Sequence, residues 1–284
     1  MSVTGGAAGA AGAAAWPRWI GANLARGARA LVRPPLAQAT PRVRADRRLI
    51  AAAAVAALLV TAATMILLDA AVAEAVKGMP RSILSVFNFA TEFGKSGWFL
   101  WPLGVVLVAI AVLASPALAP VHRLLLATVA VRAGFLFTAI AAPSLLTTVM
   151  KRVIGRARPF VNDQADPFLY LPLAWRAAYA SMPSGHATTA FAAAVAVSLL
   201  WPRLRVPMFL YALVIAASRV VLDAHYVSDV FIGAIIGSIG AILVRDWFAA
   251  RRLGFAVGAD GAVRALPGPT WARVKRVARG LIAP

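Results

Sequence analysis

Six apolar runs constrain this chain more than any other feature of its sequence. They cover residues 49–70, 98–116, 124–149, 185–201, 206–222 and 229–248. A helix that crosses a bilayer needs about 20 predominantly apolar residues. The fourth and fifth runs are short, but they hold no charged residue before Arg219. Charged residues make up only 14% of the 284, against about a quarter in soluble domains. We therefore predict an all-α, polytopic membrane bundle of six transmembrane helices.

The distribution of basic residues predicts how this bundle is oriented. Residues 1–48 hold eight arginines and one acid, and residues 245–284 hold eight basic residues and two acids. An even number of spans places both tails on one side, and basic tails favour the cytoplasm. The segments between the first and second, third and fourth, and fifth and sixth runs then face outward.

The same features divide the chain into three parts. These are a basic N-terminal tail (1–48), a six-helix domain (49–248) and a basic C-terminal tail (249–284). In both tails, apolar residues recur at helical spacing among arginines. They are Ile20, Leu24 and Leu31 in the first tail, and Trp271, Val274, Ala278 and Leu281 in the second. This pattern predicts interfacial helices on the anionic lipids of the inner leaflet, although tails that only fix topology would be equally basic.

Three polar clusters fall at the predicted outer ends of helices. They are "KRVIGRARP" (151–159), "SMPSGHATT" (181–189) and "SRVVLDAHYVSD" (218–229). Ionisable groups next to lipid are expensive and usually functional. The predicted topology brings all three clusters to one membrane face, so we expect them to form one site.

The residue types in these clusters suit a phosphate group. Lys151, Arg158 and Arg219 are cations that bind phosphate oxygens. Ser184 stands at a predicted helix start, where free backbone N–H groups bind anions, and Gly185 lets an anion approach the backbone closely.

The two histidines in the clusters suit phosphoryl transfer. His225 and Asp229 are four residues apart, so on a helix the carboxylate can hold one imidazole nitrogen. An oriented imidazole can act as a nucleophile, and His186 is then free to act as a general acid. The chain has no cysteine, three histidines and no acidic cluster, so we predict neither a metal site nor a cofactor. The cations would supply the charge that magnesium supplies elsewhere.

Each cluster taken alone has an ordinary structural explanation. A lone arginine at a helix end is usually an interfacial anchor, and we interpret Arg152, Arg156 and Arg176 in this way. A lone histidine in a membrane helix often only packs or hydrogen-bonds, and "PSGH" alone could be a helix cap. The coincidence of three clusters on one face favours a functional site.

The clusters resemble the three-part signature of the type-2 phosphatidic acid phosphatase and vanadium haloperoxidase superfamily. That signature is K-x6-R-P, then P-S-G-H, then S-R-x5-H-x3-D. Here it reads Lys151…Arg158-Pro159, Pro183-Ser184-Gly185-His186 and Ser218-Arg219…His225…Asp229, with every spacing kept.

The resemblance implies a role for each residue of the signature. His225 would attack phosphorus and form a phosphohistidine, Asp229 would orient it, and His186 would protonate the leaving group and then activate water. Phosphate oxygens would be bound by Lys151, Arg158, Ser184, Gly185 and Arg219.

The haloperoxidases of this superfamily are largely soluble. Six predicted membrane spans therefore favour its lipid phosphatase branch. We expect the protein to hydrolyse a phosphomonoester or pyrophosphate of a membrane lipid. The expected substrate is undecaprenyl pyrophosphate, or a lipid of the phosphatidate or phosphatidylglycerol phosphate type. The expected location is the bacterial inner membrane, with the site facing the periplasm. Phe87, Phe89, Phe93 and Trp98 would shape the lipid entrance.

Other functions remain open at this stage. A lipid A phosphatase or a phosphotransferase would carry the same signature. A transporter or channel is the alternative from another class, because Arg132 lies inside the third run; an ion pair with Asp246 is the simpler explanation of that charge. Nucleic-acid binding by the basic tails has no support beyond their charge.

Overall fold

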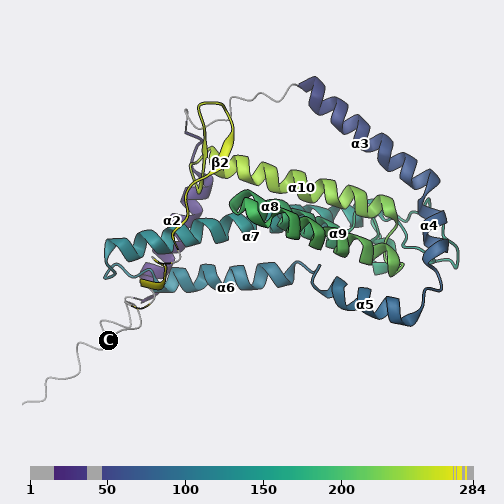
Figure 1. Ribbon diagram of the computed structural model, residues 1–284, viewed down its shortest axis with the longest axis horizontal. Helices are drawn as coiled ribbons and strands as arrows, with labels where there is room; N and C mark the ends of the chain where they lie inside the picture. Colours follow the sequence, from purple (N-terminus) through teal and green to yellow (C-terminus); the bar gives the residue numbers. More distant parts are fainter. Residues whose placement is uncertain (1–15, 37–46, 271, 273, 277–278, 280–284) are drawn as a thin grey trace, which may run out of the picture. The chain divides into compact units, whose positions relative to one another are not determined.

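The computed structural model describes residues 16–36, 47–270, 272, 274–276 and 279, and most of them are helical (Figure 1). Five helical segments are long and apolar enough to cross a membrane. They are Arg48–Leu67, Arg81–Leu113, Pro120–Ile154, Pro202–Val221 and Val227–Ala249. The remaining predicted run corresponds to the apolar helix α8 (Gly185–Leu200), which is shorter, with 16 residues. The structure therefore confirms a mostly helical protein with five candidate membrane-spanning helices.

The described parts of the chain form two compact units, which we treat separately. The first draws on residues 1–41, 102–134 and 247–284, and the second on residues 42–101 and 135–246.

The first unit contains an N-terminal helix and a small hairpin. Helix α2 (Trp16–Val32) covers the N-terminal residues with helical spacing, and its position at a membrane interface stays a prediction. Its Asn23 side chain donates to the carbonyl of Ala111 at 2.8 Å. Strands β1 (Phe255–Val257) and β2 (Val263–Ala265) pair antiparallel. This hairpin corrects the all-α prediction. Of the residues predicted to form a C-terminal interfacial helix, Trp271, Ala278 and Leu281 lie outside the described part of the chain.

Arg132 belongs to this first unit, and its predicted ion pair is wrong. Its guanidinium donates to the backbone carbonyl of Leu266 at 2.6 Å. Asp246, the expected partner, accepts from Arg245 instead, at 2.7–2.8 Å. The charge of Arg132 is therefore accounted for by a carbonyl of the segment that follows the hairpin.

The second unit holds the helices that carry the three polar clusters. In chain order they are α3 (Arg47–Leu67), α4 (Asp69–Val76), α5 (Arg81–Glu92), the start of α6 (Gly97–Leu113), the end of α7 (Pro120–Ile154), η1 (Ala177–Tyr179), α8, η2 (Pro202–Leu204), α9 (Arg205–Val221) and most of α10 (Val227–Ala249). Helices α8, α9 and α10 run side by side (Figure 1). The segment 71–97, expected only as an outward connection, folds largely into α4 and α5.

Small residues allow these helices to pack closely. Nine residues of α8 are buried, all of them Ala, Thr or Ser. Gly237 of α10 lies so near α8 that an added Cβ would be 2.2 Å from the carbonyl oxygen of Thr188. Close backbone contact through small residues is the usual way for helices to associate in membranes. The hydroxyl of Thr188 also lies 3.1 Å from that of Thr147 on α7. This packing brings the end of α7 and the starts of α8 and α10 together.

Candidate active site

His225 lies in the short turn between α9 and α10, and Asp229 lies in the first turn of α10. Both side chains are buried. The distance between His225 Nδ1 and Asp229 Oδ2 is 3.7 Å, which is long for a direct hydrogen bond. The Ser181 hydroxyl donates to Asp229 Oδ2 at 2.5 Å and lies 3.4 Å from His225 Nδ1. Asp229 and Ser181 thus hold one side of the imidazole and leave Nε2 as the nitrogen available for chemistry.

The surroundings of His225 favour the neutral imidazole. Burial lowers its pKa to about 4, even though the neighbouring Asp229 acts in the opposite direction. The positive charges of Arg219 and Arg158 lower it further. At neutral pH the ring therefore keeps a free lone pair, as a nucleophile needs.

Several buried polar atoms have no hydrogen-bond partner among the described residues. Four of them belong to residues predicted to handle phosphate: Arg158 Nε, Ser184 Oγ, His186 Nε2 and Arg219 Nε. The others are Asp223 Oδ1, Tyr226 OH and Arg251 Nε. Buried polar groups are normally satisfied. A phosphate group, with its several acceptor oxygens, has the chemistry to satisfy the four atoms of the first group.

The predicted cations gather where α7, α8 and α9 meet. Lys151, Arg158 and Arg219 lie near enough to act on one another electrostatically. A Cβ added to Gly185 would lie 3.2 Å from Lys151 Nζ, so this ammonium group sits over the first residue of α8. The backbone N–H of Ser184 donates to the carbonyl of Asp229 at 2.9 Å, which ties the start of α8 to the start of α10. The structure thus brings the predicted residues of all three clusters together.

Arg156 corrects the sequence interpretation, because it is not an interfacial anchor. Its side chain is fully buried. Its Nη1 lies 2.5 Å from Asp229 Oδ1, and its Nη2 lies 2.8 Å from Asp69 Oδ2. Burial alone would lower the pKa of Arg156, but the carboxylates of Asp229 and Asp69 outweigh it and raise that pKa. Arg156 is therefore a positioning residue for Asp229.

Asp69 and Ser228 complete this buried network, and the sequence did not single out either for the site. The backbone N–H of Ser228 donates to Asp69 Oδ1 at 3.0 Å, and Arg156 Nη1 donates to the Ser228 hydroxyl at 2.7 Å. Asp69 ends an otherwise apolar run. A carboxylate in that position requires a partner, which is the signal that could have identified it.

The two other predicted anchors, Arg152 and Arg176, lie outside this network. Arg152 Nη1 donates to the carbonyl of Arg176 at 3.3 Å, and its guanidinium lies 5.8 Å from the centre of the Trp175 ring. Arg176 is exposed. This is consistent with the anchor interpretation, which stays a prediction.

The end of α5 and the turn that follows it reach the site. A Cβ added to Gly94 would lie 2.9 Å from Cδ2 of His186, and the hydroxyl of Thr91 accepts from Arg219 Nη1 at 2.6 Å. The predicted entrance residues Phe89, Phe93 and Trp98 are exposed and flank this turn, with centroid distances of 5.4 and 5.5 Å between successive rings. Phe87 is only half-buried.

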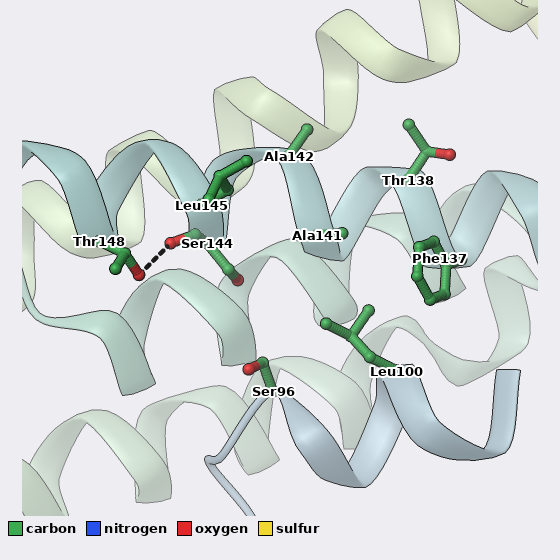
Figure 2. Close-up of a pocket in the computed structure, with 9 residues that line it drawn as sticks. All are labelled: Ser96, Leu100, Phe137, Thr138, Ala141, Ala142, Ser144, Leu145 and Thr148. Carbon is green, nitrogen blue, oxygen red and sulfur yellow. Dashed lines mark hydrogen bonds between the residues drawn. The ribbon is translucent and has the colours of Figure 1, made fainter. Parts of the chain in front are cut away.

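A groove of about 530 Å³ runs along the membrane-spanning helices beside this turn. Figure 2 shows side chains of α7 on one side and Ser96 and Leu100 on the other. Its lining residues are Ser96, Leu100, Phe137, Thr138, Ala141, Ala142, Ser144, Leu145 and Thr148. Ser96 is two residues from Gly94, and Thr148 is one helical turn from Lys151. The groove therefore extends from the neighbourhood of the cations into the apolar part of the helices.

Comparisons with known proteins agree with the motifs. A profile of the PAP2 superfamily matches residues 132–253. A lipid A 1-phosphatase of Rhizobium etli is 32% identical over 204 residues, which cover 70% of this chain and 85% of the relative. A lipid A 1-phosphatase of Rhizobium johnstonii is 38% identical over 128 residues, covering 45% and 52%.

Two solved structures also match. Aquifex aeolicus LpxE is 25% identical, with a TM-score of 0.45 over 62% of this chain and 94% of that one. The first transmembrane PAP2 type phosphatidylglycerolphosphate phosphatase from Bacillus subtilis is 20% identical, with a TM-score of 0.48 over 67% and 93%. The profile match and the Rhizobium etli relative confirm the family expected from the motifs: this chain belongs to the PAP2 superfamily.

Proposed function

We propose that the chain removes a phosphate group from lipid A, or from a closely related lipid, by metal-free phosphoryl transfer through His225. The chain is an integral membrane lipid phosphatase and a phosphoric monoester hydrolase. The observation that carries the mechanism is the set of four unpartnered, buried polar atoms on Arg158, Ser184, His186 and Arg219, around a neutral histidine.

The reaction proceeds in two steps. In the first, Nε2 of His225 attacks phosphorus, the bond from phosphorus to the lipid oxygen breaks, and His186 donates a proton to that oxygen. In the second, His186 takes a proton from water, the resulting hydroxide attacks the phosphorus of the phosphohistidine, and the bond from phosphorus to Nε2 breaks, which releases inorganic phosphate and restores His225. Asp229 holds Nδ1 throughout and stabilises the positive charge that develops on the imidazole.

Cationic side chains stabilise the transferring phosphoryl group. Lys151, Arg158 and Arg219 bind its oxygens together with the Ser184 hydroxyl and the N–H of Gly185. Fixed positive charges aimed at a developing anion are among the strongest catalytic devices. In this proposal, these cations supply the positive charge that magnesium supplies at other phosphoryl-transfer sites.

The names of the Rhizobium relatives and the groove support a lipid substrate. Both relatives are lipid A 1-phosphatases, which favours the lipid A alternative over undecaprenyl pyrophosphate, the substrate expected first from the sequence. The groove would take an acyl chain while the phosphate occupies the cationic site (Figure 2). The lipid would enter laterally from the bilayer.

For topology, we propose six spans with α8 as the fourth, both termini in the cytoplasm, and the site facing the periplasm of a bacterial inner membrane. Helix α8 is about 24 Å long, short for a bilayer core of about 30 Å, but other helices surround it. The basic tails, including α2, would then rest on anionic inner-leaflet lipid. In this cysteine-free chain, an impermeant thiol reagent applied to spheroplasts should label Val161→Cys and not Thr270→Cys. The reverse pattern would contradict the orientation.

The division of labour between the histidines provides the test of the mechanism. p-Nitrophenolate is a good leaving group and hardly needs a proton. His186→Ala should therefore release about one equivalent of p-nitrophenolate from p-nitrophenyl phosphate in a burst, and then stall with acid-labile phosphate on the protein. His225→Ala should show neither burst nor label. A burst from His225→Ala, with none from His186→Ala, would reverse the two roles.

A panel of lipids tests the substrate. Lipid A, undecaprenyl pyrophosphate and phosphatidylglycerol phosphate should be compared for release of inorganic phosphate, and lipid A should give the highest kcat/KM. Transfer of labelled phosphate to a second lipid, in place of release, would identify a phosphotransferase. An absence of turnover on every lipid and on p-nitrophenyl phosphate would leave the transporter alternative.

A further inference from the structure

The segment Pro167–Trp175, which we call the 167–175 loop, exposes an unusual amount of apolar surface. Phe168 is 56% exposed, Leu173 68% and Trp175 83%. Leu171 between them is also exposed. The loop lies outside every membrane-spanning helix. A concentration of large exposed apolar side chains in a connecting loop marks a binding surface.

Backbone pairing holds this loop in place. The N–H of Leu171 donates to the carbonyl of Gly155 at 2.7 Å, and the N–H of Ala157 donates to the carbonyl of Leu169 at 2.9 Å. Gly155 has φ +64°, and a Cβ there would lie 1.9 Å from the carbonyl oxygen of Leu171. Only glycine permits this approach. The apolar side chains are therefore presented by a fixed loop that is paired to the segment just before Arg158.

The loop continues the lipid-facing surface of α7. Leu145, Val149 and Arg152 share one face of this helix because they lie three or four residues apart. Leu145 is 67% exposed and Val149 is 55% exposed, and in a helix that crosses the membrane such side chains face lipid. Arg152, the next residue of this face, carries the cation–π contact to Trp175. Tryptophan and arginine at the end of a spanning helix are typical of the membrane interface.

We propose that the 167–175 loop inserts its apolar side chains into the leaflet on the side of the active site, where they contact lipid acyl chains. Trp175 then stands next to the end of the groove nearest Lys151, because Leu145 and Thr148 line the groove on the same side of α7 as Arg152. Through its pairing with residues 155–157, the inserted loop sets the depth of Arg158, so that the phosphate site lies level with lipid headgroups. This second part rests on the proposed function, whereas the membrane contact does not.

Site-directed spin labelling tests the insertion directly. Single cysteines at Phe168 and Leu173 in the full-length protein would carry nitroxide labels, and Gln164→Cys, an exposed polar position of the same outer segment, is the control. In lipid nanodiscs, the labels at positions 168 and 173 should collide more often with oxygen, which concentrates in the bilayer, than with a water-soluble nickel chelate. The label at position 164 should show the opposite preference. Water-like accessibility at either loop position would overturn the proposal.

Activity tests the role of the loop toward substrate. Trp175→Ala should reduce kcat/KM for the lipid in vesicles by about tenfold, the loss expected for one large apolar contact, and leave turnover of p-nitrophenyl phosphate unchanged. Trp201→Ala removes another exposed tryptophan, at the end of α8 opposite to the site. This variant should change neither the turnover of the lipid nor that of p-nitrophenyl phosphate. Normal lipid turnover by Trp175→Ala would overturn the positioning role. If the wild-type protein hydrolysed no substrate, the proposed function would fail, and the spin labels would still report on insertion.

Discussion

Replacing Arg156 with methionine removes the centre of the buried charge network while keeping much of the side-chain volume. The carboxylates of Asp69 and Asp229 both lose their cation, and both are buried. Removing one partner of a buried ion pair destabilises a protein by about 3–5 kcal/mol. We expect the midpoint of thermal unfolding in detergent to fall on the order of 10 °C.

The same substitution should impair the chemistry, because Asp229 loses the hydrogen bond from Arg156. The contacts of Asp229 with Ser181 and with the N–H of Tyr226 remain, so the carboxylate should move only a short distance. A displacement of a catalytic group by about 1 Å can lower a rate about 100-fold. In a rapid-mixing experiment, the rate constant of the p-nitrophenolate burst should fall by about that factor. This loss of rate is measured separately from the loss of thermal stability.

Two further variants show whether charge is the cause. Adding Asp69→Asn to Arg156→Met removes one uncompensated carboxylate. The double variant should therefore unfold at a higher temperature than Arg156→Met alone. A double-mutant cycle measures this coupling between the two residues. Arg152→Met is the matched control at a partly exposed site, and its effect should stay within about 1 kcal/mol. Wild-type unfolding and a wild-type burst in Arg156→Met would refute the reasoning, as would a double variant that is less stable than the single one.

Three further predictions address the site itself. Because burial lowers the pKa of His225 to about 4 from an ordinary 6.5, an NMR titration of a variant that lacks His122 and His186 should find the remaining ring neutral down to about pH 4. The contribution of His225 to stability is complete above pH 6.5 and is lost as the pH falls toward 4. A ring that titrates at its ordinary value in this variant would contradict the prediction. Turnover should survive EDTA and be inhibited by vanadate, which mimics the five-coordinate phosphoryl group, whereas loss with EDTA and recovery with magnesium would exclude the metal-free mechanism. Arg158→Ala should lose on the order of 100-fold in kcat and Arg152→Ala little, and equal losses in folded protein would mean that the two roles are misassigned.

Hydropathy predicted the long helices because the requirement for about 20 apolar residues acts on each segment separately. The run predicted at 229–248 corresponds to Val227–Ala249. The run at 124–149 underestimates α7, which spans Pro120–Ile154, because a helix continues beyond its apolar part where neighbouring segments support it. Helices α4 and α5 could not be predicted in this way, because they are short and do not cross the membrane by themselves.

The motifs were predictable for a similar reason, since each is a short segment whose residue types suit one task. The Asp69–Arg156 pair was not, because 87 residues separate its members and each looks ordinary alone. An aspartate at a helix end resembles a cap, and an arginine among other basic residues resembles an anchor. Only the packing of α4 and α10 around residue 156 shows that the two charges meet.

Arg156 also explains how a carboxylate and a phosphate site can coexist at such close range. Asp229 lies near enough to Arg158 to interact with it electrostatically, and an unpaired carboxylate would draw that guanidinium away from substrate. Because Arg156 pairs with Asp229 and with Asp69, Arg158 and Arg219 keep unsatisfied donors. Four cations and two carboxylates leave the site with a net charge of about +2, which a phosphate monoester dianion neutralises. The buried network therefore separates the carboxylate that orients the nucleophile from the cations that bind the phosphate.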